Sequence, residues 1–102
     1  MQIYIQTPIG HTIRLDFVYF YKSIILKHPV LLGEEREIIR SIESPFTIRR
    51  SSRDPSVVLH YCIFKTRMLC SVIKITETYC FLITSYPCDS VKQGEILWQK
   101  YI

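Results

Sequence analysis

Residues 57–86, VVLHYCIFKTRMLCSVIKITETYCFLITSY, decide the fold that the sequence predicts. Three runs within this stretch, 57–65, 68–76 and 79–86, are rich in β-branched and aromatic side chains and are separated by short polar turns. Such runs are typical of consecutive antiparallel strands. We therefore predict a three-stranded meander, with a further short strand at residues 46–51 just before it.

A helix is predicted between the first residues and the meander. Asp16 can cap its amino end, and apolar residues such as Phe20 and Ile24 recur at helical spacing after it. The helix should end at His28-Pro29, because the residue before a proline resists helical geometry.

A second helix and an N-terminal hairpin complete the predicted elements. The helix begins after Gly33 and ends at Ser44-Pro45, and residues 2–7 and 11–15 alternate around a Pro-Ile-Gly turn. Helices followed by a run of strands predict an α+β fold. We expect an N-terminal β-hairpin and two helices packed on one face of a four-stranded antiparallel sheet, in one domain spanning residues 1–102.

Side-chain alternation along the strands divides the meander into two faces. The face expected to pack on the helices carries His60, Cys62, Phe64, Leu69, Ser71, Ile73, Ile75, Phe81 and Ile83. The opposite face carries Leu59, Tyr61, Ile63, Cys70, Val72, Lys74, Leu82, Thr84 and Tyr86. Because the second set mixes polar with apolar side chains, it is either a candidate site or an ordinary solvated sheet face.

Charge, cysteine spacing and apolar runs indicate which partners and which cellular environment to expect. The net charge of +4 permits a nucleic-acid partner without requiring one. The four cysteines, at positions 62, 70, 80 and 88, form no Cys-x-x-Cys pair, so their spacing does not indicate a zinc site. The first residues lack the pattern of a signal peptide, and the apolar runs are too short to span a bilayer. A cytoplasmic protein with reduced cysteines and no membrane partner is expected.

Several residues have side chains suited to chemistry on phosphates. Arg49, Ser51 and Arg53 lie in the segment IRRSSRDP, where guanidinium groups and hydroxyls can bind phosphate or form a solvated basic turn. His28 is either a general acid or base or a helix cap.

Four more candidates lie on the strands. The side chains of Tyr61, Lys74, Thr84 and Tyr86 can stabilise an anionic transition state without a metal.

Read together, the segments TPIGHTIRL, ILKHPVLL, IRSIESPFTIRRSSRDPSVVLHY and CFLITSYPCDSVKQGEILW resemble a family of small bacterial and phage proteins. That family is grouped in the barnase–EndoU–colicin–RelE (BECR) superfamily of ribonucleases. The resemblance runs from about residue 6 to residue 98, nearly the whole chain. Its most specific parts are the His-Pro after the first helix, the R-x-S-x-x-D-P turn at residues 49–55 before the meander, and the T-x-Y-P-x-D exit of the last strand.

The resemblance implies cleavage of RNA by general acid–base chemistry, without a metal or another cofactor. By position it carries over His28, Arg49, Ser51, Arg53, Tyr61, Lys74, Thr84 and Tyr86 as site residues. From their chemistry we expect His28 or Lys74 to be the base, the arginines to bind phosphate, and the hydroxyls to stabilise the transition state.

The resemblance also suggests a toxin, with an antitoxin protein as a partner beside RNA, and it leaves the oligomeric state open. The competing hypotheses are a non-catalytic module that binds RNA or protein on the same sheet face, and a small structural protein.

Overall fold

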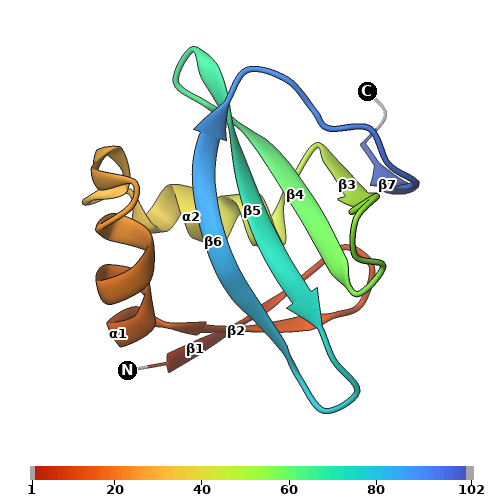
Figure 1. The fold of residues 1–102 in the computed structure, drawn as a ribbon, viewed down its shortest axis with the longest axis horizontal. Coiled ribbons are helices and arrows are strands. Elements are labelled where there is room, and N and C mark those ends of the chain that lie inside the picture. The colour runs from red at the N-terminus through yellow and green to blue at the C-terminus, as the bar shows by residue number, and fades with distance from the viewer. Residues whose placement is uncertain (1, 101–102) are drawn as a thin grey trace.

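A computed structural model describes residues 2–100 of the chain. The strands are β1 (Gln2–Gln6), β2 (Thr12–Asp16), β3 (Thr47–Arg50), β4 (Val57–Phe64), β5 (Arg67–Ile75), β6 (Cys80–Cys88) and β7 (Ile96–Gln99). The helical elements are α1 (Phe17–Tyr19), η1 (Phe20–Ile25), η2 (Pro29–Leu31) and α2 (Glu35–Glu43). All seven strands form one sheet in the order β1-β2-β6-β5-β4-β3-β7 (Figure 1).

The prediction of a four-stranded antiparallel sheet is therefore wrong. β2 pairs in parallel with the start of β6 through Ile13 with Cys80 and Arg14 with Phe81, which joins the N-terminal hairpin to the sheet. At the other end, β7 pairs antiparallel with β3. A parallel pairing of two residue pairs leaves no local sequence signal, and β7 is a short strand that follows a polar segment.

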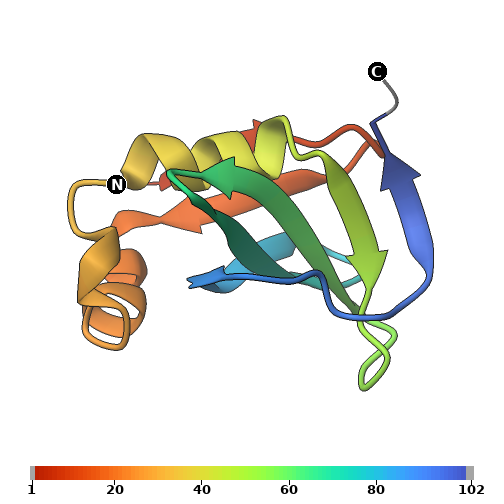
Figure 2. The same ribbon diagram turned by 90° about the horizontal axis from the view of Figure 1, so that it is seen from above.

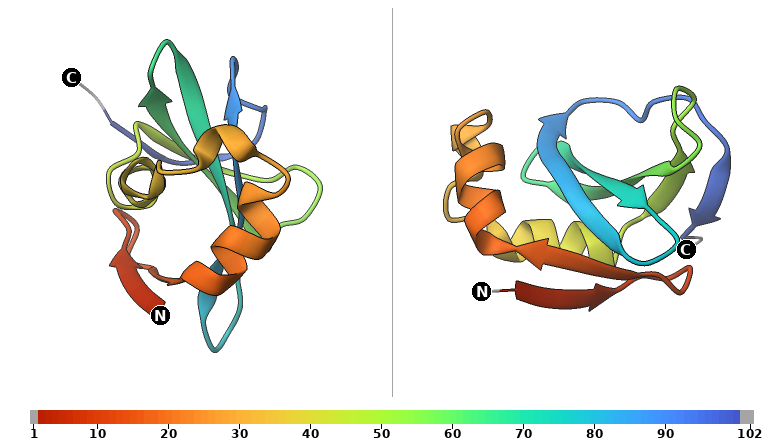
Figure 3. Two further views of the ribbon diagram at one scale, coloured as in Figure 1. Left: turned by 90° about the vertical axis from the view of Figure 1, so that its left-hand side faces the viewer. Right: turned by 60° about the horizontal axis from the view of Figure 1, so that its bottom comes forward.

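The two helical regions also differ from the predicted pair. Asp16 caps the first as expected, since its Oδ1 accepts hydrogen bonds from the backbone of Val18 (2.9 Å) and Tyr19 (3.3 Å). The region is only one α-helical turn, however, and it continues as a π-helix over η1. It lies beside β6, whereas α2 covers β4 and β5 and reaches β1 (Figures 2 and 3).

One apolar core fills the space between α2, the β1–β2 hairpin and one face of the meander. Ile38 and Ile42 of α2 are completely buried in it, together with Phe20 and Ile24 of η1 and Ile13 of β2. Figure 1 shows β1 and β2 running across the ends of β4, β5 and β6, so the hairpin closes the lower side of this core. The β1–β2 hairpin is therefore part of the structural framework that encloses the core.

A β-bulge in β6 changes the faces that were predicted for residues 81–83. Val72 pairs with Thr84 and Ile73 pairs with Leu82, so Ile83 is an extra residue in β6. Leu82 consequently lies in the core beside Ile73, while Phe81 lies opposite Lys74. The prediction was wrong for residues 81–83 and correct for the residues it placed on β4 and β5.

Polar side chains lie inside the core beneath α2. The Oγ atoms of Ser41 and Ser71 are 2.5 Å apart, and those of Ser71 and Ser85 are 2.8 Å apart. His60 neighbours Ser71 across the β4–β5 ladder and is fully buried, and neither of its ring nitrogens has a hydrogen-bond partner of standard geometry among the described residues. Burial lowers the pKa of His60 to about 4, against a smaller opposing effect of the nearby backbone of Ser41 and Ile42.

The position of the bulge leads us to predict that Leu82 of β6 contributes to stability through the core. Replacing Leu82, which is 2% exposed, with alanine should lower the free energy of unfolding by about 2–4 kcal/mol, because a buried leucine leaves a cavity. The matched Ile63→Ala variant removes a side chain that is 57% exposed, and should change it by less than about 1 kcal/mol. Urea titration measures both values; equal losses would contradict the observed facing of β6.

His60 predicts a specific loss of stability in acid. Its pKa is about 4 in the folded chain against an ordinary 6.5, so the unfolded chain binds the proton first as the pH falls. Between pH 7 and pH 4 this costs about 3 kcal/mol of unfolding free energy. The variant His60→Leu should lack that part of the pH dependence. Urea titrations of both proteins across this range test it, and parallel pH profiles would refute it.

Candidate functional site

A groove of about 420 Å³ lies on the face of the meander that is turned away from α2. It is lined by Ser51, Ser52, Arg53, Val57, Leu59, Val72, Tyr86, Lys92 and Gln93. Three parts of the chain therefore build it: the loop after β3, the strands β4 to β6, and the segment between β6 and β7. None of the nine lining residues is acidic.

The segment of residues 89–95, here called the strap, passes from β6 to β7 across this face (Figure 2). It is anchored by a hydrogen bond from the backbone N–H of Lys92 to the Tyr61 hydroxyl oxygen (3.0 Å) and by packing of Val91 over a small apolar cluster. Gly94 permits its approach to β3, since a Cβ atom there would collide with the Arg50 carbonyl oxygen. The strap thus holds Lys92 at the groove.

Tyr86 connects the groove to the end of the first helical region. The rings of His28 and Tyr86 have centroids 6.2 Å apart and are tilted by 38°. The Lys92 Nζ lies 5.6 Å from the centroid of the same tyrosine ring. Burial, and the neighbouring Cys70 thiol to a smaller degree, raise the pKa of Tyr86, so its phenol stays protonated and can donate a hydrogen bond.

The β3–β4 loop presents Arg53 at the groove. The Ser51 Oγ accepts hydrogen bonds from the backbone N–H groups of Arg53 (3.2 Å) and Asp54 (3.4 Å), which orders the turn. The Arg53 guanidinium has no ion-pair or hydrogen-bond partner among residues 2–100. It is therefore available to an anionic ligand.

Lys74 lies on the same sheet face as Tyr86, as predicted, but it does not line the groove. Its Nζ donates to Asp54 Oδ2 (3.1 Å) and to Ser56 Oγ (2.6 Å). Hydrogen bonds from Ser56 and the ion pair with Lys74 lower the pKa of Asp54 to about 2. Lys74 is four residues along β5 from the partner of Tyr86, which is about 13 Å at the rise of a strand.

The other three predicted residues, Tyr61, Arg49 and Thr84, do not line the groove. Tyr61 is fully buried and holds the strap. Arg49 donates from Nε to the Thr47 Oγ1 (3.1 Å) and does not line the groove. The Thr84 Oγ1 is buried and has no hydrogen-bond partner in the described part of the chain, although Thr84 pairs with the lining residue Val72. Of the predicted set, Ser51, Arg53 and Tyr86 line the groove, and His28 lies beside the Tyr86 ring without lining it.

Lys92 is the site residue that sequence reasoning missed. The segment SVKQGE has no strand or helix periodicity, so nothing in the sequence indicated that it returns across the sheet. The single signal was Gly94, because an isolated glycine can mark a close backbone approach.

The distribution of charge favours an anion at the groove. Ion pairs occupy the carboxylates of Glu34, Glu37, Asp54, Asp89 and Glu95. Arg53, Lys92 and the exposed Lys27 beside His28 belong to none of those pairs. The groove is thus lined by two unpaired cations, Arg53 and Lys92, and by no acidic side chain.

Comparisons with known proteins add no relative. A scan against protein-family models, a search of curated proteins and a search of solved structures each found no significant match.

Two further observations concern metals and membranes. Within residues 2–100, no three histidine, cysteine or acidic side chains are grouped so that they could hold a metal ion. No helix in that range has both the length and the apolar character needed to cross a membrane.

The anchoring of the strap can be tested on its own. In the variant Tyr61→Phe, the Lys92 amide loses its acceptor, and its hydrogen exchange should accelerate about three- to tenfold, as expected for one hydrogen bond. Tyr79→Phe is the control, because that ring is 47% exposed and its hydroxyl has no partner among the described residues. Unchanged exchange at Lys92 in the first variant would show that Tyr61 does not hold the strap.

Proposed function

We propose that the chain is a metal-independent endoribonuclease whose site is the groove between the β3–β4 loop, β6 and the strap. The observation that carries the proposal is the pairing of the His28 ring with Tyr86, a residue that lines the groove together with Arg53 and Lys92. These four residues come from distant parts of the sequence. The resemblance to BECR ribonucleases, which includes the His-Pro and strand-exit motifs, supports the same reading.

The chemistry needs one base, cationic groups and a hydrogen-bond donor. In the proposed reaction His28 takes the proton of an RNA 2′-hydroxyl, and the 2′-oxygen attacks the neighbouring phosphorus. The bond from phosphorus to the 5′-oxygen breaks, and that oxygen takes a proton from water, which leaves a 2′,3′-cyclic phosphate and a 5′-hydroxyl. The imidazolium then returns its proton to the hydroxide.

The other side chains stabilise charge rather than move protons. Arg53 and Lys92 face the phosphate oxygens, where guanidinium and ammonium groups offset the developing negative charge. The neutral Tyr86 phenol donates a hydrogen bond to one of those oxygens. Lys74 is not used as a base, because its ammonium is bound to Asp54 and Ser56.

A second candidate function is a non-catalytic RNA-binding module on the same face. It is favoured by the lack of a second proton-transfer group, since His28 is the one histidine that touches Tyr86 among the described residues and the Tyr86 pKa is raised. Binding would then depend on Arg53 and Lys92 and fall steeply with salt.

Cleavage of a labelled single-stranded RNA in the presence of EDTA tests the proposal. His28→Ala should reduce the rate about 10²- to 10⁴-fold, as for loss of a general base. His11→Ala is the matched control, because that histidine lies in a different cavity. An RNA with a 2′-deoxy substitution at the cleaved nucleotide should be resistant.

The phosphate-binding role is tested with a matched pair of arginines. Arg53→Ala should raise the KM for RNA, whereas Arg36→Ala, on the exposed surface of α2, should not. Cleavage that persists in His28→Ala, or on the 2′-deoxy substrate, would exclude the proposed chemistry. Salt-dependent binding without any cleavage would establish the second candidate function instead.

A further inference from the structure

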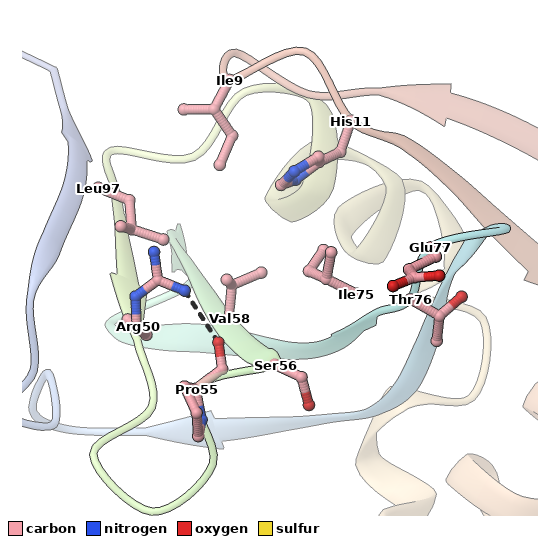
Figure 4. Close-up of a pocket in the computed structure, with 10 residues that line it drawn as sticks. All are labelled: Ile9, His11, Arg50, Pro55, Ser56, Val58, Ile75, Thr76, Glu77 and Leu97. Atoms are coloured by element: carbon pink, nitrogen blue, oxygen red, sulfur yellow. Dashed lines mark hydrogen bonds between the residues drawn. The ribbon is translucent and has the colours of Figure 1, made fainter.

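A second cavity, of about 620 Å³, lies on the other side of the sheet from the groove. It is lined by Ile9, His11, Arg50, Pro55, Ser56, Val58, Ile75, Thr76, Glu77 and Leu97 (Figure 4). Its volume is within the range typical of sites for small organic ligands. It shares no lining residue with the groove, and nothing in the proposed reaction uses it.

The walls of this cavity are aliphatic and face one another. Val58 and Ile75 form the side that belongs to the sheet, and Ile9 from the β1–β2 turn lies across from them (Figure 4). Leu97 of β7 adds to the apolar surface. Two opposed aliphatic walls suit a flat apolar body, because such a body covers both of them at once.

The polar groups at the ends of the cavity are not equivalent. Arg50 already donates from Nε to Glu95 Oε1 (2.8 Å) and from Nη1 to the Pro55 carbonyl oxygen (2.8 Å), so its charge is paired. Glu77, at the opposite end, has no ion-pair or hydrogen-bond partner among residues 2–100. The uncompensated charge of the cavity is therefore negative, in a chain whose net charge is +4.

His11, at the end of the β1–β2 turn, also lines the cavity, but its unsatisfied nitrogen does not face it. Its Nδ1 is buried and has no hydrogen-bond partner in the described residues, while its backbone N–H donates to the Thr7 Oγ1 (3.1 Å) and fixes the turn. Because that ring nitrogen is closed off from the cavity, it is not an acceptor for a bound ligand. The exposed Glu77 carboxylate is therefore the group that the cavity offers to a cation.

We propose that this cavity binds a small aromatic amine, with the flat ring between the aliphatic walls and the ammonium group directed to Glu77. The apolar contact supplies most of the attraction, and the charge-assisted hydrogen bonds fix the orientation. The proposal does not depend on the ribonuclease function, since the two sites have no residue in common.

Three indole compounds with the same ring test the charge preference directly. Tryptamine is cationic at pH 7, tryptophol is neutral and indole-3-propionate is anionic, and each carries its polar group on a two-carbon arm. Titration followed by NMR chemical shifts of the Val58 and Ile75 methyl groups measures each affinity. Tryptamine should bind about tenfold more tightly than tryptophol, and indole-3-propionate most weakly.

Matched variants locate the interaction. Glu77→Gln should remove the preference for tryptamine over tryptophol, whereas Glu43→Gln, which changes an exposed carboxylate outside the cavity, should leave it intact. Far-UV circular dichroism of each variant confirms that the fold is retained.

Three outcomes would overturn the inference. The first is equal affinity for all three compounds, and the second is a tryptamine affinity that Glu77→Gln leaves unchanged. Absence of any shift at Val58 and Ile75 at millimolar ligand would also reject it. RNA cleavage by the same preparations is a separate readout, so failure at this cavity is distinguishable from failure of the proposed enzyme function.

Discussion

The extra residue at Ile83 in β6 is the constraint on which both faces of the sheet depend. Because side chains alternate with a period of two, one inserted residue exchanges the faces on either side of it. Before the bulge, Leu82 enters the core beside Ile73. After it, Tyr86 is turned to the groove while Ser85 stays under α2, where its hydroxyl meets Ser71. Without the bulge, Leu82 would share the groove face with Tyr86, and Phe81 would take its place in the core.

The groove is made by loops held against a rigid sheet. The β3–β4 loop is ordered by the Ser51 hydroxyl and by the bonds that join Lys74 to Asp54 and Ser56. The strap is ordered by Tyr61 and by the close approach of Gly94 to β3. Several residues expected to act on a substrate therefore act on the loops, and position Arg53 and Lys92 instead. Candidate binding side chains on loops over a rigid scaffold are a common arrangement in proteins.

The groove and the cavity near the β1–β2 turn carry unpaired charges of opposite sign, a difference that the net charge of the chain does not show. The groove contains unpaired cations and no acidic lining residue, whereas the cavity near the β1–β2 turn contains a paired arginine and an unpaired carboxylate. Ion pairing, rather than composition, produces this difference. The first arrangement suits a phosphate and the second suits an ammonium group, which is why two different ligand classes are proposed for one small domain.

By itself, the sequence determined the meander strands, the Asp16 cap, the start of α2 and the residues of β4 and β5 on each face, because local periodicity and capping chemistry dictate them. It also proposed His28, Ser51, Arg53 and Tyr86 as candidates, because their side chains suit phosphate chemistry. Only the tertiary structure decided the bulge, the parallel β2–β6 pairing, the return of the strap with Lys92, and the pairing of Lys74 with Asp54. Each of these is a contact between distant segments, and such contacts are set by packing and register, which leave no local pattern in the chain.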